Sequence, residues 1–375
     1  MRKIVFLTGT RADFGKLKSL IEITLNDPQY EVHIFVTGMH MQYKYGYTVD
    51  EIVKCGYPNI YKFINHTTNN SMDKNLGKTI MGFSDYVNGL APDLIVVHGD
   101  RVETLAGSIV GSLNNILVAH IEGGEVSGTI DELIRHAVSK MSHSHFVSNQ
   151  SAKKRLIQMG EKKNSIFEIG SPDIDVMLSD TLPGIDKVMS HYDINFNEYG
   201  VVLYHPVTTE LDKTTENARE LVEGLINSGK NFVVIYPNND YGSVEILNEY
   251  KKLENYSRFK VFPSIRFEYF LVLLKNASCL VGNSSAGIRE APYYGVPTIN
   301  IGSRQNNRAL HNEIINCPHE KLNIESAINI AFKSKFKPIR LYGEGNSDLL
   351  FKRTIDGSEF WNISKQKEFK DLVNE

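Results

Sequence analysis

Short apolar runs rich in β-branched residues alternate with segments of helical periodicity along most of the chain. In the first half these runs are residues 3–9, 32–38, 94–100, 116–124, 144–149 and 166–170. They are almost continuously apolar, which is typical of strands that are buried on both faces of a sheet. Helical patterns such as Leu17, Leu20 and Ile21 lie between them. This rhythm predicts a parallel sheet that is covered by helices.

The same rhythm restarts in the second half of the chain. The expected strands there are residues 200–208, 231–239, 259–264, 278–285 and 297–302. Residues 216–229 predict a helix that stops at Gly229. The last residues, 358–375, predict a closing helix.

Between the two halves, residues 171–199 contain two prolines and several Asp and Asn residues, so we interpret this stretch as the connection between domains. We expect an α/β fold with two doubly wound domains, residues 1–175 and 176–375, and a closing helix that returns to the first domain. In open α/β sheets ligands lie beyond the carboxyl ends of the strands, so we expect a ligand in a cleft between the halves.

Composition narrows the class of partner. The 375 residues include 41% hydrophobic residues, and 41 Lys and Arg against 44 Asp and Glu give a net charge of −3. This balance argues against a nucleic-acid coat or a polybasic membrane patch. No apolar run approaches the roughly 18 residues of a membrane span, and the first ten residues are too polar for a signal peptide. Cys55, Cys279 and Cys317 form no CxxC, so we expect reduced thiols in a cytoplasmic protein.

Three acidic residues follow or flank predicted strands. Asp100 and Glu122 end two of them, and Asp131 begins a predicted helix. Carboxylates that lie close together raise one another's proton affinity and supply an acid and a base. They also stabilise an oxocarbenium-like sugar centre. Helix capping by Asp100 or Asp131 is the structural alternative.

The first predicted strand runs into residues 8–16, a glycine-containing loop before a helix. Five residues separate Gly9 from Gly15, and Leu follows Lys16, so this is not a Walker A loop. Such a loop offers backbone N–H groups to an anion, and Arg11 and Lys16 add positive charge. A tight turn with solvated cations is the alternative.

Residues 282–292 form a second loop of this kind. Small residues let backbone amides approach a phosphate, and Ser284 and Ser285 offer hydroxyl groups, before a helix that we expect from Gly287. Glu290 is placed to accept hydrogen bonds from ribose hydroxyls. A serine N-cap on a flexible turn is the structural alternative.

Two further residues are candidates for ligand binding. His205 follows a predicted strand of the second domain, and Arg266 lies among aromatic residues that either flank a base or pack in the core. The other histidines of interest lack an HExxH pattern or comparable spacing, so we expect no metal site. These residues are His98, His120, His136, His143 and His145.

With these residues in place, the chain resembles the hydrolysing UDP-N-acetylglucosamine 2-epimerases of bacterial sialic-acid synthesis. The stretches that carry the resemblance are residues 9–21, 36–41, 96–107, 120–140, 169–177, 205–210, 236–240, 262–277, 282–292 and 302–308. The related non-hydrolysing enzymes have Pro-Glu after the GTR motif. Here Ala12-Asp13 stands in that place and favours the hydrolysing branch.

The resemblance implies a GT-B-like fold with two Rossmann-like domains, the first carrying the catalytic acids and the second binding UDP. It implies that UDP-GlcNAc and water become N-acetylmannosamine and UDP through 2-acetamidoglucal, with no cofactor. The family's acidic catalytic positions fall on Asp100, Glu122 and Asp131. Its nucleotide-binding positions fall on Arg11, Lys16, His205, Ser284, Ser285 and Glu290, and we add Arg266. We expect a homodimer or a homotetramer.

Three alternatives remain at this point. A sister branch performs the same chemistry on UDP-2,4-diacetamido-2,4,6-trideoxyglucose for legionaminic acid. A GT-B glycosyltransferase shares the fold, but the three carboxylates and the lack of a large acceptor-binding insertion count against it. A non-catalytic nucleotide-sugar sensor is disfavoured because the candidate acids are intact.

Overall fold

The computed structural model describes residues 1–66, 71–126, 130–207, 209–305 and 314–371. The chain folds into two compact units. Unit 1 comprises Met1–Glu125, Asp131–Ser179 and Leu341–Glu375, and unit 2 comprises Val126–Ile130 and Asp180–Arg340. The chain therefore leaves unit 1 after Ser179 and re-enters it at Leu341.

Unit 1 contains a parallel sheet of seven strands in the order β3-β2-β1-β4-β5-β6-β7. The strands are β1 (Arg2–Thr8), β2 (Tyr30–Val36), β3 (Ile60–Lys62), β4 (Leu94–His98), β5 (Leu117–Ile121), β6 (Ser144–Val147) and β7 (Ile166–Glu168). The central strands β4 and β5 are buried along their whole length. This burial on both faces explains their continuous apolar sequences.

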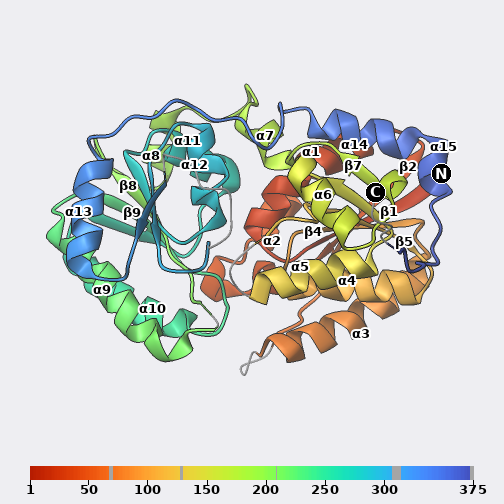
Figure 1. Ribbon diagram of the computed structural model, residues 1–375, viewed down its shortest axis with the longest axis horizontal. Coiled ribbons are helices and arrows are strands. Elements are labelled where there is room, and N and C mark those ends of the chain that lie inside the picture. The colour runs from red at the N-terminus through yellow and green to blue at the C-terminus, as the bar shows by residue number, and fades with distance from the viewer. Residues whose placement is uncertain (67–70, 127–129, 208, 306–313, 372–375) are drawn as a thin grey trace. The chain divides into compact units, whose positions relative to one another are not determined.

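Helices cover both faces of this sheet (Figure 1). They are α1 (Arg11–Leu25), α2 (Val49–Lys54), α3 (Met72–Leu90), α4 (Val102–Leu113), α5 (Ile130–Met141), α6 (Gln150–Gln158), α7 (Pro172–Met177), α14 (Ser347–Asp356) and α15 (Ser358–Trp361). On one face Phe6 of β1 packs with Phe351 of α14. On the other, Gly107 lets α4 approach Leu7 and Val97 closely.

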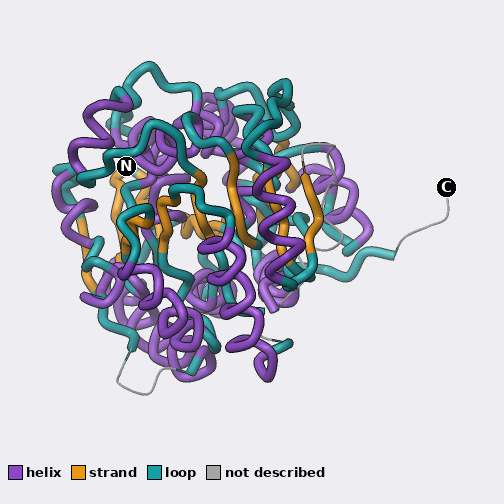
Figure 2. Tube along the Cα trace, turned by 90° about the vertical axis from the view of Figure 1, so that its left-hand side faces the viewer, coloured by secondary structure: helices purple, strands orange, loops and turns teal. Residues whose placement is uncertain are grey.

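Unit 2 contains a six-stranded parallel sheet in the order β10-β9-β8-β11-β12-β13. Its strands are β8 (Gly200–Leu203), β9 (Phe232–Ile235), β10 (Phe259–Phe262), β11 (Cys279–Gly282), β12 (Thr298–Ile301) and β13 (Ile314–Cys317). Its helices are α8 (Ile185–His191), α9 (Thr214–Asn227), α10 (Ser243–Tyr250), α11 (Phe267–Lys275), α12 (Glu290–Tyr293) and α13 (Lys321–Ala331). Figure 2 shows strands flanked by helices, as in a doubly wound fold.

The strand orders place a topological switch point in each unit. In unit 1 it lies between β1 and β4, and in unit 2 it lies between β8 and β11. Ligands of open α/β sheets bind beyond the carboxyl ends of strands at such points. The loops that follow these four strands are therefore the first places to look for a site.

Two helices predicted from the sequence are wrong in extent. The closing helix ends at Trp361, and described residues 362–371 contain no helix. Lys367 in this segment instead donates to the carbonyl of Ser142 at 2.6 Å, so tertiary contacts replace helical ones. The helix expected from Gly287 is a 3₁₀ turn, Ser285–Gly287, followed by the four-residue α12. Among the described residues, no helix is both long and apolar enough to cross a membrane.

Candidate active site

One arginine joins the ends of β4 and β5 in unit 1. Gly99, with φ of +77°, turns the chain after β4 and is followed by Asp100, while Glu122 follows β5 directly. Arg135 of α5 donates from Nη2 to the Asp100 carboxylate and from Nη1 to the Glu122 carbonyl at 2.7 Å. The guanidinium therefore fixes two of the three predicted catalytic residues relative to each other.

Glu122 is held in an unusual conformation. Its φ of +65° lies in the left-handed region, which non-glycine residues adopt rarely and at a cost. The side chain is only 3% exposed. One carboxylate oxygen accepts a hydrogen bond from the Ser171 hydroxyl, and the other lies 3.2 Å from His98 Nε2. A strained and buried carboxylate with such partners is typical of a functional site.

Asp131 lies in the first turn of α5, as predicted. Arg135 follows it by four residues on the same helix, so the two side chains share one helix face. Asp131 thus lies on the same helix as Arg135, the residue that binds Asp100 and Glu122.

The loop after β1 differs from expectation. The Asp13 carboxylate accepts the N–H groups of Gly9 at 3.0 Å and Thr10 at 3.3 Å, and the Asp13 N–H donates to the Thr10 hydroxyl. This reciprocal pattern is a capping box for α1. The predicted cradle of open amides is therefore wrong at Gly9 and Thr10, because Asp13 already occupies them.

The two cations of this loop are paired rather than solvated. Arg11 Nη2 lies 2.5 Å from the Glu51 carboxylate. Lys16 Nζ lies 3.0 Å from the carboxylate of Asp173, which is fully buried in α7. Both positive charges are thus held in fixed places beside the switch point of unit 1.

In unit 2, the loops after β8 and β11 are tied together by one amide side chain. Asn283 Oδ1 accepts the His205 N–H at 2.7 Å, and its Nδ2 donates to the His205 carbonyl at 2.8 Å. The Asn238 N–H donates to His205 Nδ1 at 3.0 Å. The neutral imidazole therefore carries its proton on Nε2, where it is a hydrogen-bond donor.

The glycine that precedes Asn283 is required by its backbone. Gly282 has φ of +140°, and a Cβ atom there would lie 1.9 Å from the Leu203 carbonyl oxygen. Close approach of the strand ends of β8 and β11 thus depends on this glycine. It brings His205 and Asn283 into register.

The remaining predicted binding residues of unit 2 lie in the turn after Asn283, at the start of α12 and directly before α11. Ser284 caps the 3₁₀ turn by accepting from the Ala286 N–H, and Ser285 begins that turn. Glu290, the first residue of α12, is 3% exposed. Arg266 precedes α11, and its guanidinium lies 5.7 Å from the centre of the Tyr269 ring.

The predicted residues therefore fall into two groups. Asp100 and Glu122 are joined by Arg135, and His205 is joined to the serine loop by Asn283. Residues that contact the predicted site residues, and that the sequence analysis did not propose for the site, are His98, Arg135, Ser171, Asp173 and Asn283. The available signals were the position of Arg135 one helical turn after Asp131 and the position of Asn283 directly before Ser284.

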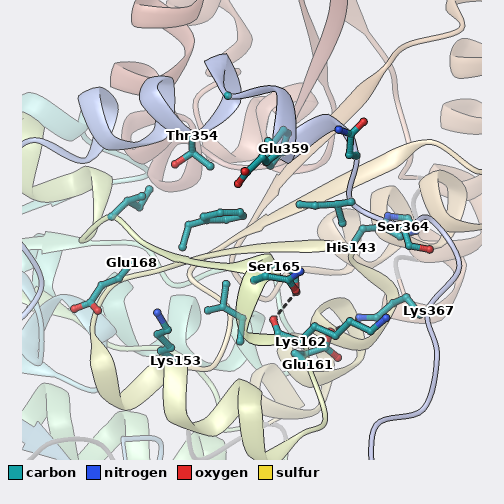
Figure 3. Close-up of a pocket in the computed structure, with 18 of the residues that line it drawn as sticks. His143, Lys153, Glu161, Lys162, Ser165, Glu168, Thr354, Glu359, Ser364 and Lys367 are labelled. Atoms are coloured by element: carbon teal, nitrogen blue, oxygen red, sulfur yellow. Dashed lines mark hydrogen bonds and ion pairs between the residues drawn. The ribbon is translucent and has the colours of Figure 1, made fainter.

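A large cavity of unit 1 lies apart from these residues. It has a volume of about 1200 Å³ and lies between β7 and the C-terminal residues 350–368, which include α15 and most of α14 (Figure 3). At its edge Glu161 accepts hydrogen bonds from Lys140 at 2.7 Å, His145 at 2.9 Å and Lys367 at 2.5 Å. None of the predicted site residues lines it. Among the described residues there is no group of His, Cys, Asp and Glu that could hold a metal ion.

Comparisons with known proteins agree with the geometry. The sequence model of one family, described as UDP-N-acetylglucosamine 2-epimerase, matches residues 23–356. A UDP-N-acetylglucosamine 2-epimerase of Neisseria meningitidis serogroup B is 48% identical, across 99% of this chain and 100% of its own. A hydrolysing UDP-N,N'-diacetylbacillosamine 2-epimerase of Legionella pneumophila is 32% identical, across 92% of this chain and 93% of its own.

The fold has close counterparts among solved structures. A Methanocaldococcus jannaschii UDP-GlcNAc 2-epimerase, in complex with UDP-GlcNAc and UDP, matches with a TM-score of 0.81 at 23% identity. The match covers 95% of this chain and 99% of that one. The predicted architecture of two parallel-sheet α/β domains, GT-B-like, is confirmed.

Proposed function

Since the chain belongs to the UDP-N-acetylglucosamine 2-epimerase family, we propose that it is a hydrolysing enzyme that converts UDP-GlcNAc and water into N-acetylmannosamine and UDP, a step of sialic-acid synthesis. The observation that carries the chemistry is the Arg135 clamp, which holds Asp100 and Glu122 together at the carboxyl edge of unit 1. The 48% identity with the Neisseria enzyme, which extends over nearly the whole of both chains, supports the choice of substrate.

The proposed reaction has two stages. In the first, the bond between C1 and the diphosphate oxygen breaks, and a carboxylate takes the proton from C2, which leaves 2-acetamidoglucal and UDP. In the second, the oxygen of water adds to C1, and a proton adds to C2 on the face opposite to the one from which the first proton was removed. The configuration at C2 is thereby inverted. Asp100, Glu122 and Asp131 supply the acid and base. The same negative charges stabilise the positive charge that develops at C1.

Departure of UDP requires stabilisation of the negative charge on the leaving diphosphate. We assign this task to the His205 Nε2–H donor, the hydroxyls of Ser284 and Ser285, and the cations Arg11 and Lys16. The support is that His205 is fixed by Asn283 with its donor tautomer defined, and that both cations are held in place by carboxylates. Preorganised donors and charges lower the barrier because they need no reorganisation during the reaction. Glu290 would accept from the ribose, and Arg266 would lie near the base.

The decisive experiment is turnover of UDP-GlcNAc in D₂O, followed by NMR. We expect UDP and free N-acetylmannosamine with deuterium at C2, because the C2 proton is exchanged for one from solvent. Free N-acetylglucosamine, or a product with protium at C2, would contradict the elimination. UDP-N-acetylmannosamine in place of the free sugar would assign the protein to the non-hydrolysing branch.

A second substrate merits the same assay, because the Legionella relative is named for a UDP-diacetamido sugar. The two candidate substrates differ at C4 and C6 of the sugar, away from the atoms that react. Parallel measurement of kcat/KM with UDP-GlcNAc and UDP-2,4-diacetamido-2,4,6-trideoxyglucose decides between them. We expect the larger value with UDP-GlcNAc, and the reverse ranking would move the protein to the legionaminic-acid branch.

A further inference from the structure

Residues 170–175, from the junction of β7 and α7 into α7, contact two of the proposed site residues. Ser171 and Asp173 are both fully buried. The Ser171 hydroxyl donates to the Glu122 carboxylate, and the Asp173 carboxylate forms an ion pair with Lys16, whose Nζ lies 3.0 Å away. A single turn of chain thus contacts one residue proposed for proton transfer and one proposed for diphosphate binding.

Ser171 departs from the ordinary behaviour of its position. It is the N-cap residue of α7, where a serine oxygen normally accepts a hydrogen bond from a backbone N–H of the first turn. Here the side chain makes no such bond, and its proton goes to Glu122 instead. A local rule broken without a gain for the helix indicates that the hydroxyl serves another purpose.

The junction is fixed by the chain that re-enters unit 1. The Ser171 N–H donates to the Tyr342 carbonyl at 2.6 Å. Gly170 and Gly343 leave no room for a side chain between them, since a Cβ atom on Gly343 would lie 2.8 Å from the Gly170 Cα. Asp175 accepts the N–H groups of Ser347 at 2.8 Å and Asp348 at 2.9 Å at the start of α14. Ser171 is therefore a rigidly mounted donor.

We propose that Ser171 is a positioning residue that fixes the plane of the Glu122 carboxylate and favours its ionised form. The proposal rests on the proposed function, because it assumes that Glu122 exchanges a proton with the sugar. A hydrogen bond donated to a carboxylate stabilises the charged state. His98 from β4 also faces the Glu122 carboxylate, while the guanidinium of Arg135 from α5 donates to the Glu122 backbone carbonyl and binds Asp100. Removal of the Ser171 hydroxyl changes no formal charge.

The test compares Ser171→Ala with Ser171→Thr, which keeps the hydroxyl. For Ser171→Ala we expect kcat with UDP-GlcNAc to fall about tenfold or more, the scale of a lost hydrogen bond to a charged group. We also expect the acid limb of the kcat–pH profile to move to higher pH, because Glu122 is protonated more readily. The dissociation constant of UDP, measured by calorimetry, should stay unchanged. Ser171→Thr should restore both kcat and the acid limb.

The matched control is Ser142→Ala. Ser142 is equally buried in unit 1, and its hydroxyl donates to the Val138 carbonyl at 2.8 Å rather than to a carboxylate. This variant should keep the wild-type pH profile even where its melting temperature falls. If Ser171→Ala does not fold, Ser171→Cys, which keeps the volume with a weaker donor, takes its place, with kcat and acid limb displaced in the same directions.

The outcomes separate the two proposals. If the wild-type protein turns over UDP-GlcNAc and Ser171→Ala has the same kcat and pH profile, the positioning role is overturned and the proposed function stands. Equal losses in Ser171→Ala, Ser171→Thr and Ser142→Ala also overturn it, because they indicate packing alone. Absence of turnover by the wild-type protein overturns the proposed function and this inference with it.

Discussion

At the carboxyl edge of the unit 1 sheet, charged side chains hold one another, whereas at the equivalent edge of unit 2 a neutral amide side chain holds the backbone of a neighbouring loop. In unit 1, Arg135 binds Asp100 and Lys16 lies against Asp173. In unit 2, Asn283 forms two hydrogen bonds with the backbone of His205. The two sheets share their strand topology around the switch point, so the difference lies in the edge residues alone.

This difference matches the two tasks proposed for the units. A centre that gains positive charge at C1 is stabilised by carboxylates whose positions are fixed before the reaction, which the Arg135 clamp achieves. For the diphosphate, the two cations proposed from unit 1, Arg11 and Lys16, are held by carboxylates, whereas the proposed donor of unit 2 is ordered by a neutral group. The Asn283 side chain orders the His205 backbone without adding a negative charge of its own. The comparison suggests where substitutions should alter turnover and where they should alter nucleotide affinity.

The largest effect is expected for Arg135→Met. The variant leaves Asp100 without its guanidinium partner and frees the Glu122 carbonyl, and breaking such pairs costs about 3–5 kcal/mol when they are fully buried. Because Asp100 is 21% exposed, we expect a loss of stability in the lower part of that range. Because the two acids are no longer held in place, we also expect kcat to fall about 100-fold or more. Steady-state kinetics and calorimetry with UDP measure the split, and UDP affinity should be preserved.

Arg155→Met is the control for Arg135→Met. Arg155 Nη1 donates to the Gly124 carbonyl at 3.1 Å, so its loss removes a guanidinium–carbonyl contact near Glu122 without touching a carboxylate. A kcat near the wild-type value is expected. A loss of UDP affinity in Arg135→Met that matches its loss of kcat would contradict the division of tasks between the units.

The positions of these acids were predictable from the sequence, but their partners were not. Buried parallel strands have continuous apolar sequences, so the ends of β4 and β5, and with them Asp100 and Glu122, could be located. The short β3 is partly exposed and was missed for the same reason. Arg135 and Ser171 lie 35 and 49 residues away from the acids that they contact. Such contacts depend on the packing of separate elements, which a local pattern does not encode.

The closing helix and the first loop show the same limit. Residues 362–371 have a composition compatible with a helix, yet Lys367 bonds to Glu161 and to carbonyls at the end of α5 instead. In the first loop, Gly9 and Thr10 lie in a strand–loop–helix pattern that is typical of anion binding. Asp13 takes their amides as part of a capping box, for which the spacing of Thr10 and Asp13 was an unused signal in the sequence.

The use of charge in unit 1 also predicts a sensitivity to acid. Burial of Glu161 favours its neutral form, but hydrogen bonds from His145 and Lys140 and the charge of Lys367 outweigh this and lower its pKa to about 2. A carboxylate with a lowered folded-state pKa stabilises the fold above its unfolded pKa, and this stabilisation is lost as the pH falls towards the folded value. We expect unit 1 to lose up to about 3 kcal/mol between pH 5 and pH 2 through this residue.

Trp361, the single tryptophan of the chain, lies in unit 1 and reports its unfolding by fluorescence. In urea titrations, Glu161→Gln should be less stable than wild type at neutral pH and should lose most of the difference in acid. Glu368→Gln, also in unit 1, is the control, because its ion pair with Lys162 is exposed and screened by solvent. An unchanged acid dependence in Glu161→Gln would remove charge as the distinction between the units at this position.

The smallest effect is expected for Asn283→Ala in unit 2. The substitution leaves the buried N–H and carbonyl of His205 without these partners, and each such loss costs about 1–3 kcal/mol. Part of this cost is recovered if the loop relaxes, so we expect UDP to bind about tenfold more weakly, with a smaller change in kcat.

The control is Asn276→Ala, which removes a side-chain hydrogen bond to the Val272 carbonyl at the end of α11 and should leave UDP affinity unchanged. Calorimetric titration of both variants with UDP decides the matter. A fall in kcat at constant UDP affinity would show that unit 2 acts on the sugar, and the contrast between the two edges would then not reflect a division of tasks.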